Sequence, residues 1–213
     1  MVITLIVLII FAGCFASMFN NGLWSNTLML VNVLTAGLLA FNYFEPLAEW
    51  LERNIEPRFT YIWDFVAVWM IFIVAMVALR SATDYVSNVK VRFFLPVDRA
   101  GSYILAIWVS WVMVSFTTAT LHTAPLARNF MGFQPAPEDR MLSGFAPDRR
   151  WLAWVRRESM GSFSRLHELS PFDPFADFIL RYGKRREEFE GQLTLMTPKG
   201  AAAASATQGI NIP

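Results

Sequence analysis

Long apolar stretches without charge dominate residues 1–122. No Asp, Glu, Lys or Arg occurs before Glu45, which leaves room for two crossings of a bilayer, and the turn signal Asn20-Asn21-Gly22 divides that stretch. Two further stretches follow, one with Asp64 near its start and one closed by Pro125. A membrane-spanning helix needs about 20 apolar residues. The pattern predicts an all-α integral membrane protein with four transmembrane helices, at about 2–19, 25–44, 60–79 and 101–121.

Two connections carry weaker helical patterns. The acidic segment 45–59 is expected to continue the second helix, with Pro46 at a start or a kink. Between the third and fourth spans, apolar residues recur at helical spacing, which is typical of a short interfacial helix lying in the membrane surface. These residues are Ala82, Val86, Val89 and Phe93. An ordinary loop fits so short a stretch equally well.

Beyond the last span the chain becomes basic and amphipathic. Asp148 is expected to cap one helix, and Asp173 a second helix that has Pro174 at its first position. A basic helix with Trp can lie on anionic headgroups, so the first helix is a candidate membrane-surface contact. Packing of both helices on each other or on the loops is the alternative. The candidate contacts are Arg149, Arg150, Trp151, Trp154, Arg156 and Arg157.

Composition supports this division of the chain. The sequence is 55% hydrophobic and only 16% charged, against about 25% charged residues in soluble domains. The deficit lies in a transmembrane domain, residues 1–122, and a basic juxtamembrane region, residues 123–191, follows it. Residues 192–213 are low in charge and rich in Ala, Gly and Thr, and we expect them to be disordered.

The residues of common catalytic centres are scarce. One cysteine and two histidines predict no disulfide framework and no metal centre, and no glycine-rich phosphate loop occurs. We therefore expect no enzyme activity, no cofactor and no nucleic-acid partner. A lipobox-like stretch at Phe11–Cys14 would make a lipoprotein if it were cleaved, but no positive residue precedes its apolar run, as a signal peptide would require.

A row of small residues marks the fourth span. Ser102, Ala106 and Ser110 follow the Asp98-Arg99 pair at four-residue intervals, and residues four apart form one ridge on a helix. Small side chains on a ridge let another backbone approach closely. The row predicts a packing surface for a helix of the same bundle or of a second copy of the chain. Asp98 is expected at the helix start, where its charge meets the helix dipole.

Polar residues inside the spans are the other candidates for function, because they are costly in a bilayer and face the bundle interior. Asn32 could be a bond between helices or a solute contact. Asp64, one turn from its helix end, is expected to reach water, and so is His122. Thr118 completes the set of intramembrane polar candidates.

These features together resemble the colicin V production protein family. The family has four spans, and an Asp-Arg pair introduces its fourth helix, with glycines where this chain has Ser102, Ala106 and Ser110. The family's turn between the first two helices is similar to the segment from Gly22 to Asn26, with Asn26 in place of the usual Glu. The resemblance covers residues 1–122. It implies a bacterial inner-membrane protein needed for toxin production or export and for envelope maintenance.

Two functions follow from these observations. One is a non-enzymatic accessory protein that assembles by helix packing, as a homo-oligomer or with other membrane proteins. The other is a subunit of an ion or solute channel or transporter, with Asn32, Thr118 and His122 on its path. Connection charges balance across the membrane, with four basic residues on each side: Arg53, Arg58, Arg128 and Arg140 against Arg80, Lys90, Arg92 and Arg99. The basic tail favours cytoplasmic termini.

Overall fold

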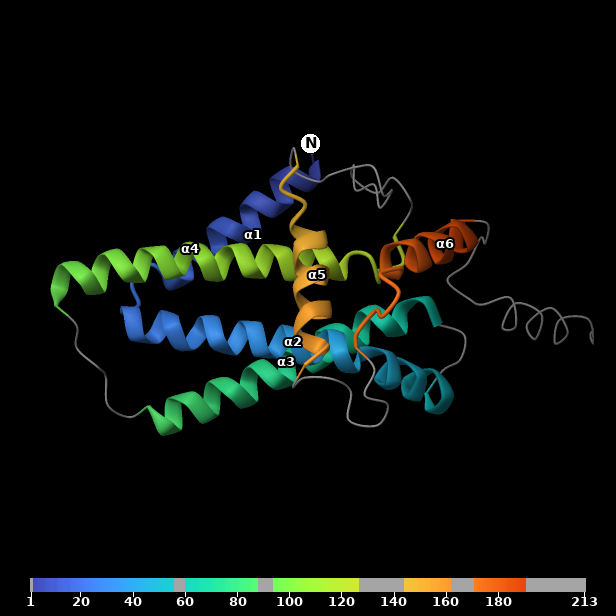
Figure 1. The fold of residues 1–213 in the computed structure, drawn as a ribbon, viewed down its shortest axis with the longest axis horizontal. Coiled ribbons are helices and arrows are strands. Elements are labelled where there is room, and N and C mark those ends of the chain that lie inside the picture. The colour runs from blue at the N-terminus through green and yellow to red at the C-terminus, as the bar shows by residue number, and fades with distance from the viewer. Residues whose placement is uncertain (1, 56–59, 88–93, 127–143, 162–170, 191–213) are drawn as a thin grey trace, which may run out of the picture.

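Six α-helices make up the part of the chain that the structure, a computed structural model, describes: residues 2–55, 60–87, 94–126, 144–161 and 171–190. No strand occurs among these residues. The helices are α1 (Val2–Met18), α2 (Leu23–Asn54), α3 (Thr60–Val86), α4 (Leu95–Thr120), α5 (Pro147–Ser159) and α6 (Phe178–Glu190) (Figure 1).

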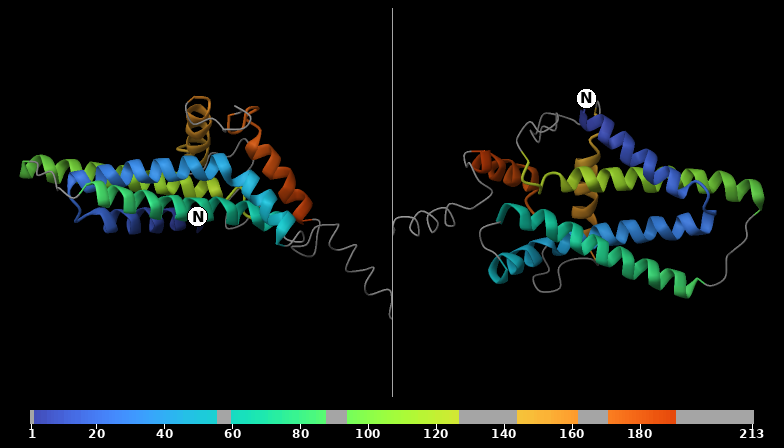
Figure 2. Two further views of the ribbon diagram at one scale, coloured as in Figure 1. Left: turned by 90° about the horizontal axis from the view of Figure 1, so that it is seen from below. Right: turned by 180° about the vertical axis from the view of Figure 1, so that it is seen from behind.

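The long helices α2, α3 and α4 form the body of the fold. Helix α2 packs against both α3 and α4, and α1 crosses α4 obliquely (Figures 1 and 2). Three stretches are long and apolar enough to cross a membrane, namely Leu23–Asn54, Tyr61–Val86 and Leu95–Thr120. Helix α1 is apolar throughout but has 17 residues, or about 26 Å, somewhat less than a hydrocarbon core of about 30 Å.

Helix α2 continues past the charge boundary at Glu45, as the sequence predicted. It includes Pro46 and ends at Asn54. Because proline lacks an N–H and crowds the preceding turn, it bends a helix, and the second half of α2 runs in a different direction from the first (Figure 2). Buried Ala48 and Leu51 keep this polar half packed on its neighbours.

Helix α3 is longer than predicted, and this corrects the expected surface helix. Ala82 and Val86 belong to the last turns of α3, and Val89 and Phe93 lie outside the described residues. An ion pair between Arg80 and Asp84, 2.9 Å apart and one turn from each other, joins successive turns across the polar end of the helix.

Helix α5 lies crosswise over α2 and α4, on one side of the layer that they form (Figures 1 and 2). Its apolar side chains Trp151, Leu152 and Val155 are buried in the core that the bundle shares with α6. The expected N-cap is shifted, since Ala146 caps α5 and Asp148 lies in its first turn.

The second tail helix begins later than predicted, at Phe178. Residues 173–177 form turns instead, because Asp173 and Ala176 have left-handed backbones, with φ of 49° and 56°, that no α-helix can contain. Residues 192–213, expected to be disordered, lie outside the described residues.

Candidate functional site

Asp98 links the start of α2 to the start of α4. Its Oδ1 accepts a hydrogen bond from the backbone N–H of Leu23 at 3.0 Å, so the carboxylate caps the N-terminus of α2, where four N–H groups lack helical partners. Gly22 is the N-cap residue of α2. Because α4 begins at Leu95, Asp98 is in its first turn rather than ahead of it. One charge therefore lies at the positive ends of two helices.

Ser102 extends this junction by one turn. Asn26 Nδ2 donates to Ser102 Oγ at 2.9 Å, and the Ser102 hydroxyl donates to the carbonyl of Asn21. Both side chains are buried. These bonds fix the turn between α1 and α2 against α4.

The rest of the small-residue row is buried within this chain. Ala106 and Ser110 have no exposed surface, and the Ser110 hydroxyl donates a hydrogen bond to the carbonyl of Ala106. Helix α4 packs against both α1 and α2, which places the row inside the bundle. Arg99, beside it in the sequence, is exposed.

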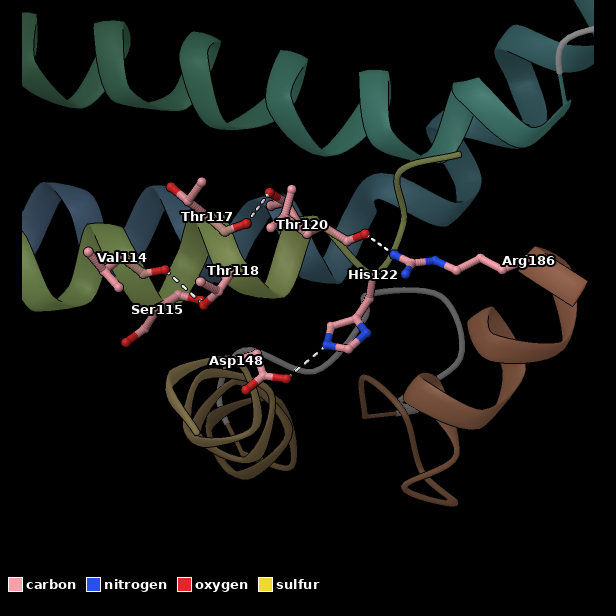
Figure 3. Close-up of polar contacts among 9 residues, drawn as sticks. Val114, Ser115, Thr117, Thr118, Thr120, His122, Asp148 and Arg186 are labelled. Atoms are coloured by element: carbon pink, nitrogen blue, oxygen red, sulfur yellow. Dashed lines mark hydrogen bonds and ion pairs between the residues drawn. The ribbon is translucent and has the colours of Figure 1, made fainter. Parts of the chain in front are cut away.

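The polar residues deep in the spans form contacts inside the bundle. Asn32 donates to Thr83 Oγ1 at 3.0 Å and so joins α2 to α3. Thr118 bonds its own helix, at the carbonyls of Val114 and Ser115 (Figure 3). Both side chains are buried.

Asp64 was expected to reach water, but this is wrong: its side chain is only 8% exposed and is bonded to α6. The Tyr182 hydroxyl donates to Asp64 Oδ2 at 3.0 Å, and Arg185 forms an ion pair with the same oxygen. Arg181 pairs with Glu45 of α2 at 3.0 Å. These groups line a cleft of about 250 Å³ between α2, α3 and α6. The two ion pairs hold α6 on the bundle.

His122 is buried too, which corrects the expectation that it would be wetted. Its Nε2 lies 2.9 Å from Asp148 Oδ2, and this pair joins the end of α4 to the first turn of α5 (Figure 3). Arg186 of α6 donates to the carbonyl of Leu121 (Figure 3). The ends of α4, α5 and α6 thus meet around one imidazole.

Burial sets the protonation of this pair. It lowers the pKa of His122 below its ordinary value, against the opposing effect of Asp148. Burial alone would raise the pKa of Asp148, but the hydrogen bond from His122 and the charge of Arg149 lower it. A neutral His122 imidazole that donates one hydrogen bond to an ionised Asp148 carboxylate agrees with the lowered pKa of each group.

A comparison with known families places the chain. Residues 3–137, more than half of its length, match the family described as colicin V production protein. The chain belongs to this family. No curated protein and no solved structure matches it. Family membership and the three long apolar helices together make it a multi-pass membrane protein.

Two positions that the resemblance seen in the sequence singled out lie against each other. Asn26 and Ser102, where the resemblance leads us to expect Glu and Gly, are joined by a hydrogen bond between α2 and α4. Asp98, of the Asp-Arg pair that carries the resemblance, bonds the start of α2 just after the turn at Gly22.

The candidate membrane-surface residues of the tail divide into two groups. Trp151 is 3% exposed, against Gly37, Phe41 and Phe116, so it does not contact headgroups. The ring of Trp154 packs beside it at a tilt, with the two centroids 5.0 Å apart. Arg149 is half-buried, and Arg156 donates to the carbonyl of Pro174 at 2.9 Å. Arg150 and Arg157 are exposed on the outer side of α5.

The contacts that α6 makes with the bundle were not anticipated from the sequence, and neither was the pair of His122 with Asp148 of α5. Arg181 and Arg185 are four residues apart, as are Tyr182 and Arg186, so two rows of α6 carry its contacts. That spacing was the available signal. No group of three or more His, Cys, Asp or Glu side chains in the described segments could hold a metal ion. Cys14 is a half-buried thiol on α1.

Proposed function

We propose that the protein is a non-enzymatic accessory protein of the bacterial inner membrane, and that it supports toxin production or export and maintenance of the envelope. The observation that carries this proposal is that polar side chains in the spans form hydrogen bonds within the chain itself. Asn26, Asn32, Ser102 and Thr118 bond to other parts of the same chain. Groups used in this way stabilise a packed bundle.

Partners would bind to the outward sides of the helices. Because the small-residue row is buried inside the chain, other copies or other membrane proteins would meet α1, α3 and α4 through their large exposed apolar side chains. These include Leu5, Leu8, Ile9, Ile73, Val74, Val77, Ile104, Ile107 and Trp108. Anionic lipids would meet the exposed arginines of α5.

Complementation and flux together test this role. A deletion strain should regain toxin release and envelope integrity with the wild-type gene, and also with Thr118→Val and Asn32→Ala variants that accumulate to wild-type levels. Purified protein in liposomes should pass no ion or small solute from a broad panel. A flux that those two substitutions abolish would instead identify a channel or transporter subunit.

Cytoplasmic termini complete the proposal. With α1 as a fourth span, both ends of the chain lie on one side of the membrane. A fluorescent protein fused after Leu193 should fluoresce, and an alkaline phosphatase fused at the same point should be inactive. The opposite pair of results would reverse the orientation.

A further inference from the structure

The short loop of residues 171–177, just before α6, exposes one aromatic side chain on the surface of the protein. Phe175 is 85% exposed, whereas Phe172 and Phe178 on either side of it are fully buried. An isolated exposed phenylalanine is unremarkable by itself. Here, however, the loop that carries it has a defined conformation.

Four contacts and two backbone angles fix that conformation. The N–H of Phe172 donates to Ser159 Oγ, the N–H of Asp177 donates to Asp173 Oδ1, and Arg156 donates to the carbonyl of Pro174, each at 2.9 Å. The backbones of Asp173 and Ala176 have φ of 49° and 56°, a left-handed conformation that a Cβ disfavours. The fourth contact is the burial of Phe172 in the core. The loop is therefore held in a costly shape with Phe175 outward.

The surroundings of this loop match a lipid–water interface. Helix α5 lies across the spans, so it runs parallel to a membrane that they cross, and the loop lies on the same side of the α2–α4 layer (Figure 2). Arg156 of α5 donates to the carbonyl of Pro174, next to Phe175, and so places the loop beside α5. Helix α5 also carries the exposed Arg150 and Arg157, and Met160 is exposed just after its C-terminal end. Guanidinium groups beside apolar side chains are typical of segments that bind anionic membrane surfaces.

The inward side of α5 lies slightly deeper than the apolar face of a typical interfacial helix. Trp151 packs on Gly37, about two turns, or roughly 12 Å, before the first charge of α2 at Glu45. Interfacial helices embed their apolar face by about 5–10 Å. We propose that Phe175, with the exposed Arg150 and Arg157, anchors this side of the protein in the anionic lipid interface. The inference rests on the proposed inner-membrane location.

Fluorescence quenching in vesicles tests the anchor in the full chain. In a Cys14→Ser background, which removes the native thiol, Phe175→Cys is labelled with an environment-sensitive fluorophore. The protein is then reconstituted into vesicles of phosphatidylglycerol and phosphatidylcholine that carry a spin label near the headgroups. We expect a blue-shifted emission and quenching several-fold stronger than at Glu49→Cys, a control on the exposed polar half of α2.

A second control separates the anchor from the membrane assignment. Ile73→Cys lies on the exposed side of α3, near its middle, and should be quenched by spin labels placed deep in the acyl chains. If Ile73→Cys is not quenched, the proposed membrane location itself fails, and the anchor with it. If Ile73→Cys is quenched but Phe175→Cys behaves like Glu49→Cys, the anchor alone is refuted, and the exposed Phe175 would instead contact a protein partner.

The contribution of the arginines is tested in the same system. Replacing phosphatidylglycerol by phosphatidylcholine, or combining Arg150→Gln with Arg157→Gln, should each reduce quenching at Phe175→Cys at least two-fold. The Ile73→Cys signal should not change. Equal quenching at Phe175→Cys in both lipid mixtures would refute the role of anionic headgroups.

Discussion

Trp151 is the residue on which the docking of α5 depends most. Its ring lies in a slot at Gly37, where a Cβ would come within 2.5 Å of the indole, and its centroid is 5.7 Å from that of Phe116 and 6.3 Å from that of Phe41. A buried aromatic side chain removes about 150–250 Å² from solvent. At about 25 cal/mol per Å², Trp151→Ala loses about 4–6 kcal/mol of transfer free energy.

One term opposes this loss. The indole N–H of Trp151 is buried and has no hydrogen-bond partner among the described residues, which costs about 1–3 kcal/mol in the native protein. The net destabilisation of the docked helix by Trp151→Ala should then be about 1–5 kcal/mol, and its central value of about 3 kcal/mol is at the lower end of the usual range for Trp→Ala in cores. Trp151→Phe keeps most of the ring and removes the unpartnered N–H, so it should cost less than about 1.5 kcal/mol.

Limited trypsin digestion of the protein in liposomes measures this difference. Cleavage at Arg150 and Arg157 within α5 reports the fraction of molecules in which the helix has opened, provided that opening is fast relative to cleavage. A loss of about 3 kcal/mol should accelerate this cleavage about 100-fold, and Trp151→Phe should accelerate it less than about ten-fold. The reasoning is refuted if Trp151→Ala is cleaved in α5 as slowly as wild type, or if both variants are cleaved equally fast.

Three further predictions concern His122, the small-residue row and Asp98. Burial lowers the pKa of His122, so as the pH falls the unfolded chain binds a proton at this imidazole before the folded protein does, near pH 6.5. The free energy of unfolding should therefore be greatest above this pH and should fall towards pH 5. In thermal scans, the melting temperature of His122→Gln should depend less on pH than that of the wild type. Ala106→Leu or Ser110→Leu overfills a site without exposed surface and should destabilise the monomer by about 1–3 kcal/mol or more, seen as a lower melting temperature in detergent; unchanged melting would exclude close packing at the row. Asp98→Ala removes the acceptor for the Leu23 N–H and should cost about 0.5–2 kcal/mol in the same scans, whereas Asp98→Asn should retain part of that stability.

The sequence predicted the helices well where polarity alone decides them. The change at Glu45 and the turn at Gly22 follow from local composition, and so did the extension of α2 through Pro46. The end of α3 was harder, since the charges at Arg80 suggest a membrane boundary but do not end a helix whose charges pair one turn apart. The position at which a helix leaves the membrane and the position at which the helix ends therefore need not coincide.

The contacts of the tail could not be predicted, because they join residues far apart in the chain. Asp64 and Arg185 are 121 positions apart, and nothing local distinguishes a carboxylate that meets water from one that meets α6. The pattern of α5 is also ambiguous: an apolar stripe with Trp151 fits a lipid surface and a protein surface equally well. Gly37, the residue that decides between them, lies in another helix.

The Asp98 cap also constrains the order in which the chain is assembled during synthesis. Leu23 and the carboxylate that accepts its N–H are 75 positions apart, so at about 5–20 residues per second the ribosome needs about 4–15 s to supply the acceptor. Until then the N-terminal end of α2 has to use water for that hydrogen bond, which keeps it at the edge of the bilayer. The hairpin of α1 and α2 can enter the membrane early, but its turn reaches its final hydrogen bonding only when the start of α4 arrives on the same side.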